Sequence, residues 1–86
     1  MQTTELVLNN DSGLHARPGK DFVQLAKTFE SVVTVIKNGE RYNGKSLMKI
    51  MQAGLSKGDT FQIETEGADE EKALAALADY IGNLRE

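Results

Sequence analysis

Polar and hydrophobic residues alternate along four short stretches of the chain, which predicts four β-strands. In the last stretch Phe61 and Ile63 fall on one face, as expected for a strand with one buried side. Asn38-Gly39 separates the second stretch from the third and is a strong signal for a two-residue hairpin turn. The predicted strands cover residues 3–8, 32–37, 40–43 and 60–65.

Three further segments carry apolar residues at helical spacing. The first follows His15, and Pro18 is compatible with it because a proline is tolerated in the first turn of a helix. The second is short and runs from Ser46, its expected N-cap, to near Gly54. The third begins at Asp69, whose side chain is expected to cap the helix. The predicted buried stripes are Phe22, Leu25, Ala26 and Phe29 in the first helix and Leu74, Leu77, Ile81 and Leu84 in the third.

The order of the predicted elements is β-α-β-β-α-β-α. Hairpin connections and strands with one apolar face favour an antiparallel sheet with its helices on one side. We therefore expect an α+β open-faced sandwich, with a four-stranded antiparallel sheet and three helices on one face. A length of 86 residues fits a single domain, residues 1–86.

Composition narrows the possible functions. The chain is 40% hydrophobic and 27% charged with a net charge of −3, which fits a soluble globular protein and argues against a nucleic-acid partner. It has no cysteine and one histidine, so a cysteine or histidine metal cluster is excluded and no cofactor is expected. There is neither a long apolar run nor a signal-peptide pattern, which predicts a cytoplasmic protein without membrane insertion.

The run His15-Ala16-Arg17-Pro18 combines three features that suit a phosphohistidine. A neutral imidazole is a good nucleophile near pH 7. The start of a helix attracts an anion through its backbone N–H groups and its dipole, and arginine offers a planar fork of donors to phosphoryl oxygens. By itself a histidine ahead of a helix is more often a surface or capping residue, so the motif needs support from elsewhere in the chain.

That support comes from a resemblance over essentially the whole length. Residues 13–18, Gly-Leu-His-Ala-Arg-Pro, are similar to the active-site motif of the HPr phosphocarriers, and residues 45–48, Lys-Ser-Leu-Met, to their regulatory-serine motif. The resemblance implies that Nδ1 of His15 accepts a phosphoryl group from phosphorylated Enzyme I and passes it to IIA domains of sugar permeases. Such a protein is a stoichiometric carrier and not an enzyme. It also implies that Arg17 and the backbone amides of Ala16 and Arg17 stabilise the phosphate.

The short helix after Ser46 carries more apolar residues than so short a helix normally buries. Ile50 is the natural core residue, Met51 can be placed either way, and Leu47 and Met48 are expected to face outward. In the HPr family this helix and the start of the first helix dock partner proteins. We therefore predict a docking surface formed by Lys20, Lys27, Leu47, Met48, Lys49 and Met51, with lysines that favour acidic partners.

Ser46 has a structural and a regulatory interpretation. As an N-cap its hydroxyl satisfies a free N–H group. The resemblance also implies phosphorylation by HPr kinase/phosphorylase, with a catabolite-control transcription factor as a further partner. Lys49 is typical of family members without this regulation, whereas Met48 is typical of members that have it. The chain also has Gly19-Lys20 where most members continue with small or apolar helix formers.

Three alternatives stay open at this point. Instead of a sugar-branch carrier, the sequence is compatible with a nitrogen-branch phosphocarrier paralogue or with a mainly regulatory protein that acts through phosphorylated Ser46. The third alternative is a small α+β module without phosphate chemistry. The presence of His15 argues against the second, because purely regulatory relatives typically lack the active histidine. A transient carrier is expected to be a monomer.

Overall fold

The computed structural model describes residues 1–84 of the chain. Its elements follow in the predicted order β-α-β-β-α-β-α, and most of their bounds lie within one residue of the predicted ones. The elements are β1 (Gln2–Val7), α1 (Ala16–Lys27), β2 (Val32–Lys37), β3 (Glu40–Asn43), α2 (Leu47–Ala53), β4 (Thr60–Glu66) and α3 (Glu70–Gly82).

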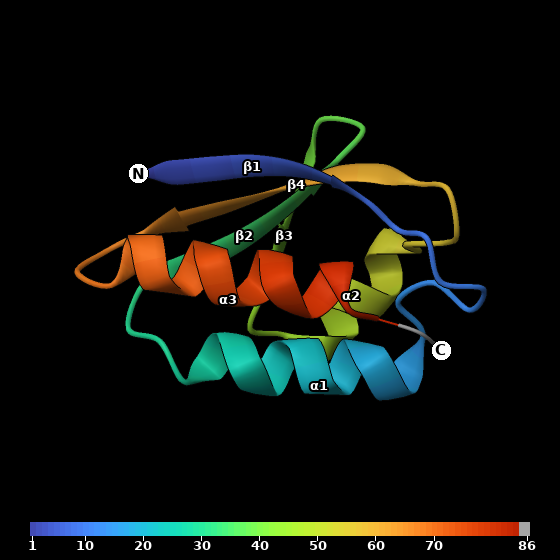
Figure 1. The fold of residues 1–86 in the computed structure, drawn as a ribbon, viewed down its shortest axis with the longest axis horizontal. Coiled ribbons are helices and arrows are strands. Elements are labelled where there is room, and N and C mark those ends of the chain that lie inside the picture. Colours follow the sequence, from blue (N-terminus) through green and yellow to red (C-terminus); the bar gives the residue numbers. More distant parts are fainter. Residues whose placement is uncertain (85–86) are drawn as a thin grey trace.

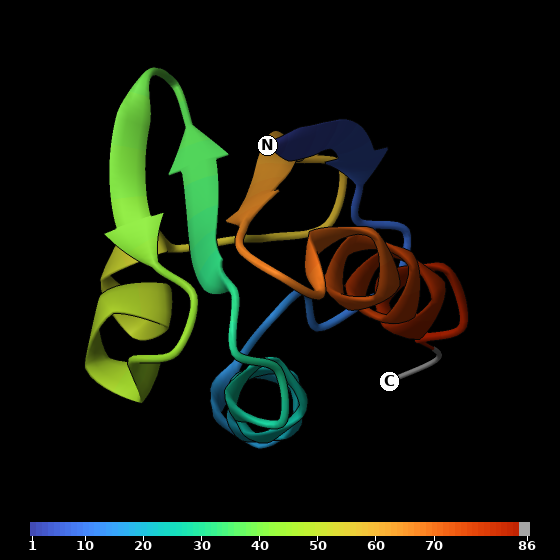
Figure 2. The same cartoon turned by 90° about the vertical axis from the view of Figure 1, so that its left-hand side faces the viewer.

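The four strands form one sheet in the order β1-β4-β2-β3, and every neighbouring pair is antiparallel. All three helices lie on the same side of the sheet (Figures 1 and 2). Helix α3 packs against β1 and β4, α2 contacts β3, and α1 contacts both other helices. The predicted open-faced α+β sandwich is therefore confirmed.

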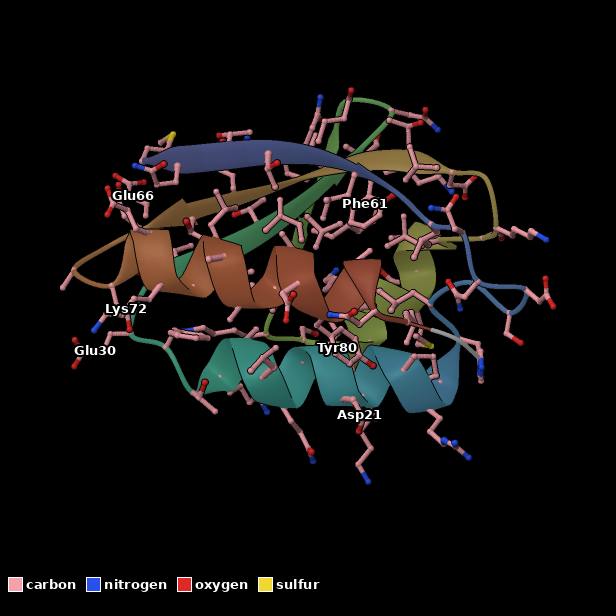
Figure 3. All side chains as sticks on the ribbon, in the orientation of Figure 1. Asp21, Glu30, Phe61, Glu66, Lys72 and Tyr80 are labelled. Atoms are coloured by element: carbon pink, nitrogen blue, oxygen red, sulfur yellow. The ribbon has the colours of Figure 1, made fainter. Side chains whose placement is uncertain are left out.

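The hydrophobic core lies between the inner face of the sheet and the helices. Val35 of β2 and Ile63 of β4 are opposite each other in the register, and both are fully buried. Phe61 extends from β4 into the space between the sheet and α3 (Figure 3). The helices contribute a matching set of fully buried side chains: Phe22 and Ala26 from α1, Ile50 from α2 and Leu77 from α3.

Helix α1 buries a face that is shifted from the predicted stripe. Phe22 and Ala26 are buried as expected, but Leu25 and Phe29 are only half-buried. Val23, which the predicted stripe omits, is buried instead. The reason is that α1 packs against both α2 and α3, so the side chains that face these two helices are the ones buried.

The local turn signals are confirmed. Asn38 and Gly39 both adopt positive φ, 53° and 81°, as the tight hairpin between β2 and β3 requires. Ser46 is the N-cap of α2, where its Oγ accepts a hydrogen bond from the Lys49 amide at 3.3 Å. Within residues 1–84, the helices are all too short or too polar to cross a membrane.

Asp69 occupies the predicted N-cap position of α3, but its carboxylate does not cap that helix. It accepts hydrogen bonds from the amides of Glu30 and Ser31, both at 2.9 Å, and from the Ser31 hydroxyl. The prediction of a side-chain cap is therefore wrong, because the segment between α1 and β2 supplies better-placed donors. The carboxylate ties the start of α3 to the start of β2.

We expect Asp69→Asn to destabilise the protein at neutral pH and to flatten the acid side of its stability profile. The Ser31 hydroxyl, followed by the Glu30 amide, holds the pKa of Asp69 below its usual value. A carboxyl whose folded pKa is lowered stabilises the fold above its unfolded pKa of about 4, and this stabilisation is lost as pH falls through the folded pKa. Asparagine lacks the charge and places an NH₂ group where an acceptor is needed.

Urea unfolding at pH 7 and pH 3 measures this effect. Asp21→Asn is the matched control, because it removes the same charge from an exposed side chain that points away from the protein (Figure 3). The prediction is contradicted if Asp69→Asn and Asp21→Asn lose the same free energy of unfolding on going from pH 7 to pH 3.

Candidate functional site

His15 lies immediately before α1 and is exposed. Its backbone is extended, with φ −76° and ψ −168°, and its carbonyl accepts the Gly19 N–H at 2.7 Å, which closes the first turn of the helix. Its imidazole makes no capping hydrogen bond to the first turn of α1. The residue therefore contributes its backbone to the helix start while its side chain faces solvent.

Arg17 and Ala16 begin α1 directly after the histidine, and both are exposed. Amides at the start of a helix point along its axis toward the position that an anion would take. Pro18, the third residue of α1, has no N–H and is buried. This arrangement places an imidazole, a guanidinium and a helix N-terminus within three consecutive residues.

The loop before His15 is fixed by close backbone contacts. Asn10 and Gly13 bond to each other twice, through Asn10 Nδ2 to the Gly13 carbonyl at 2.7 Å and the Gly13 N–H to the Asn10 carbonyl at 3.2 Å. The Leu14 amide donates to the Leu55 carbonyl at 2.9 Å. Gly13 has a φ of 63°, and a Cβ at this position would lie only 2.5 Å from the Leu55 oxygen. Loop 9–14 is thus held against loop 54–59.

Loop 54–59 is itself supported by an ion pair that sequence analysis does not reveal. Lys37 Nζ donates to the carbonyls of Ala53 and Gly54, at 3.2 and 2.9 Å, and lies 3.0 Å from the Asp59 carboxylate. The Ser56 amide, and after it the Lys37 ammonium, hold the pKa of Asp59 below its usual value. Lys37, at the end of β2, therefore holds both the C-terminus of α2 and loop 54–59, whose Leu55 carbonyl accepts the Leu14 N–H.

Helix α3 holds the first turn of α1 from the opposite side. The Tyr80 hydroxyl donates to the Pro18 carbonyl at 3.1 Å, and its ring lies 6.5 Å from that of Phe22 in a tilted arrangement. Figure 3 shows Tyr80 between α3 and α1. Sequence analysis misses Tyr80 because a contact across 62 residues leaves no local signal.

Helix α2 lies beside the start of α1. Met48 is 69% exposed and Leu47 37% exposed, whereas Ile50 is fully buried, as predicted. Met51 is half-buried and packs against the core. Lys20 and Lys49 are exposed, and Ser46 is half-buried at the N-cap. The structure therefore brings one set of predicted docking residues close to the histidine segment.

Lys27 is not part of this group. It lies in the last turn of α1, twelve residues beyond His15, which corresponds to roughly 18 Å along the helix axis. Its charge is therefore at the other end of the helix from the imidazole. Among residues 1–84, the His, Asp and Glu side chains form no group of three that could hold a metal ion.

We expect Gly13→Ala to destabilise the protein more than Gly58→Ala. Both glycines adopt positive φ, 63° and 88°, which costs a residue with a Cβ about 1–2 kcal/mol. A Cβ at Gly58 would meet nothing within 4 Å, whereas one at Gly13 would collide with the Leu55 backbone. Relief of that clash costs about another 1–3 kcal/mol.

Urea unfolding measures the two free energies, and the NMR signals of the His15 ring report whether the loop has moved. The ring signals are expected to shift in Gly13→Ala and to stay near those of the wild type in Gly58→Ala. Equal loss of stability in the two variants would show that the approach of Gly13 to Leu55 is unimportant.

The chain matches a known family. The family model for the PTS HPr component phosphorylation site matches residues 2–83. The phosphocarrier protein HPr of Neisseria meningitidis serogroup A is 46% identical over 80 residues, which cover 93% of this chain and 88% of that protein.

Two solved structures show the same fold. HPr from Thermoanaerobacter tengcongensis is 43% identical and superimposes with a TM-score of 0.93, covering 95% of this chain and 92% of its own. Crh, a catabolite repression protein of Bacillus subtilis, is 35% identical with a TM-score of 0.78, covering 100% and 99%. On this evidence the chain belongs to the HPr family of phosphocarriers of the phosphotransferase system.

Proposed function

We propose that this protein carries a phosphoryl group on His15 between phosphorylated Enzyme I and IIA domains of sugar permeases. The observation that carries the proposal is the exposed imidazole at the start of α1, followed at once by Ala16 and Arg17. Membership of the HPr family supports it, because the family model describes a phosphorylation site and covers this segment.

The transfer is a substitution at phosphorus. The lone pair on Nδ1 of the neutral His15 ring attacks the phosphorus atom, and the P–N bond to the donor histidine of Enzyme I breaks. The donor imidazole leaves with the electron pair of the broken bond. One P–N bond forms and one breaks, so their number is unchanged. The reverse type of step, with His15 as the leaving group, delivers the phosphoryl group to the IIA domain.

Arg17 acts on the phosphoryl group while it moves between the two imidazoles. Hydrogen bonds to a charged group contribute about 1.5–3 kcal/mol each, so full engagement of Arg17 in the resting phosphohistidine would slow donation. Contacts that are strongest in the transition state accelerate transfer. The exposed position of Arg17 at the second residue of α1 suits this role.

The partner proteins dock on the apolar face of α2. Leu47 and Met48 are exposed beside the histidine segment, and a methionine adapts to unlike surfaces because its thioether repacks readily. Lys49 follows Met48 in α2 and Lys20 lies in the first part of α1; both are exposed and attract acidic partners. A nitrogen-branch carrier would use the same chemistry with a different Enzyme I and IIA domain.

We expect the wild-type protein, incubated with Enzyme I and phosphoenolpyruvate, to gain one phosphate that is stable in base and labile in acid. His15→Ala removes the nucleophile and is expected to gain none. Intact mass spectrometry before and after acid treatment measures both. Circular dichroism should show an unchanged fold, because the His15 side chain is exposed and makes no capping bond to α1.

Transfer from a nitrogen-branch Enzyme I, and not from the sugar-branch enzyme, would assign the protein to that branch. If the wild-type protein is phosphorylated by neither, or if His15→Ala is phosphorylated equally well, the carrier proposal is wrong.

A regulatory role for Ser46 is the second candidate. The serine is the N-cap of α2 and lies two residues before the exposed Met48. The start of a helix tolerates a phosphate at this position. The phosphate adds nearly two negative charges to the docking surface, where it repels acidic partners. The similarity to a catabolite repression protein supports this role. We propose that HPr kinase/phosphorylase modifies Ser46 and that a catabolite-control transcription factor binds the product.

We expect Ser46→Asp to slow phosphorylation of His15 by Enzyme I at least tenfold while it leaves stability near the wild-type value. Aspartate is as good an N-cap as serine, and its charge imitates part of a phosphate. Ser46→Ala is the control, because it loses about 1 kcal/mol of stability with the cap but adds no charge. Initial transfer rates and urea unfolding measure the two effects. If Ser46→Ala slows transfer as much as Ser46→Asp, charge is not the cause.

A further inference from the structure

Lys37 is the last residue of β2, and its side chain is only 19% exposed. Its ammonium group lies 3.0 Å from the Asp59 carboxylate and donates hydrogen bonds to the carbonyls of Ala53 and Gly54. A lysine has three N–H donors, so each of them has an acceptor within reach. The ammonium group is therefore a fixed junction between the end of β2, the end of α2 and the loop that follows α2.

Asp59 passes this restraint along its loop. Its carboxylate also accepts the Ser56 amide at 2.8 Å, and its own amide donates to the Ser56 carbonyl at 3.0 Å. The buried Leu55 lies between Ser56 and Gly54, whose carbonyl binds the Lys37 ammonium. The backbone on both sides of Leu55 is thus held by groups that Lys37 orients.

The Leu55 carbonyl is the acceptor of the Leu14 amide, at 2.9 Å, and Leu14 is the residue directly before His15. The same loop also binds the residue after β1, because the Gly58 amide donates to the Leu8 carbonyl at 2.7 Å. A continuous path of hydrogen bonds and backbone therefore leads from the Lys37 ammonium to the residue that carries the imidazole.

A second ion pair joins the same two loops but is built differently. Lys57 Nζ lies 2.9 Å from the Asp11 carboxylate, and the two side chains are 58% and 88% exposed. Exposed ion pairs of this kind contribute little, because water and salt screen them. The position of the Leu55 carbonyl therefore depends on Lys37 far more than on Lys57.

We propose that Lys37 is a positioning residue for phosphotransfer, which keeps the Leu55 carbonyl in place for Leu14 and so keeps the His15 imidazole where transfer needs it. The inference rests on the proposed carrier function. Without the ammonium group, two carbonyls and a carboxylate lose their common donor, so the loop shifts toward water to find new ones. The Leu14 bond then opens more often, and the imidazole spends less time in position to attack. A displacement of about 1 Å at a reacting atom can cost about a hundredfold in rate.

Lys37→Met tests the proposal in the full chain, because methionine is also unbranched but has no donor. We expect hydrogen exchange of the Leu14 amide, followed by NMR, to accelerate at least tenfold. We expect kcat for phosphotransfer from Enzyme I to fall at least fivefold. KM should stay within twofold of the wild type, because the exposed Leu47 and Met48 lie at the opposite end of α2 from Ala53.

Lys57→Met is the matched control, since it makes the same substitution in the other lysine–aspartate pair of the loop. It should leave kcat and the exchange rate of Leu14 within twofold of the wild-type values. Lys37→Arg should restore most of both, because a guanidinium keeps the charge and the donors. Asp69→Asn weakens the fold at another place, so it should leave kcat unchanged and separate positioning from a general loss of stability.

Urea unfolding verifies that each variant is folded under the assay conditions. Asp59→Asn supplies a second test should Lys37→Met fail to fold. It removes the charge of one of the three acceptors, so both quantities should change in the same direction by a smaller factor.

The proposal is overturned if Lys37→Met leaves Leu14 exchange within twofold of the wild type, or lowers kcat no more than Lys57→Met does. Faster exchange with an unchanged kcat overturns it as well, because the loop would then be held without consequence for transfer. If the wild type accepts no phosphate from any Enzyme I, the proposed function has failed, and the role of Lys37 in transfer fails with it. The exchange rates report the link from Lys37 to Leu14 in either case, so the two failures are distinguishable.

Discussion

The hydrogen bond from the Leu14 amide to the Leu55 carbonyl is the interaction on which the rest of the site depends. It joins the residue before the histidine to a loop that is itself fixed by Lys37 and Asp59. The bond can form only because Gly13 has no Cβ, since a methyl group there would displace the Leu55 backbone. Loop 9–14 is therefore placed by its contact with loop 54–59, which Gly13 makes possible.

The first turn of α1 is then held from three sides. Loop 54–59 supports Leu14, Tyr80 of α3 binds the Pro18 carbonyl, and Met51 of α2 fills the space above Gly19. Because the three helices share one face of the sheet, α2 and α3 necessarily flank α1 (Figure 2). Three elements of the sandwich thus hold the short helix start, although the histidine side chain itself faces solvent.

Local features could be predicted from the sequence because their causes are local. The Asn38-Gly39 turn, the Ser46 cap and the outward position of Met48 each depend on residues within a few positions along the chain. The supports of the site could not be predicted, since their partners are far apart in sequence: Lys37 and Gly54 are 17 residues apart, and Tyr80 and Pro18 are 62 apart. Asp69 shows the conflict directly, because a distant segment supplies its donors where the local pattern indicates a helix cap.

Three contacts that hold the helix start are uncharged, and this suits a carrier: the Leu14–Leu55 backbone bond, the Tyr80–Pro18 bond and the approach of Met51 to Gly19. A phosphoryl group brings nearly two negative charges to its acceptor, which would disturb any neighbouring ion pair. A backbone hydrogen bond, a tyrosine hydroxyl and an apolar methyl group do not respond strongly to an added anion. Two ion pairs support loop 54–59: Lys37–Asp59 joins it to the end of β2, and Lys57–Asp11 joins it to loop 9–14. We therefore expect the backbone of the site to be the same before and after phosphorylation, so that donor and acceptor proteins meet one preformed surface.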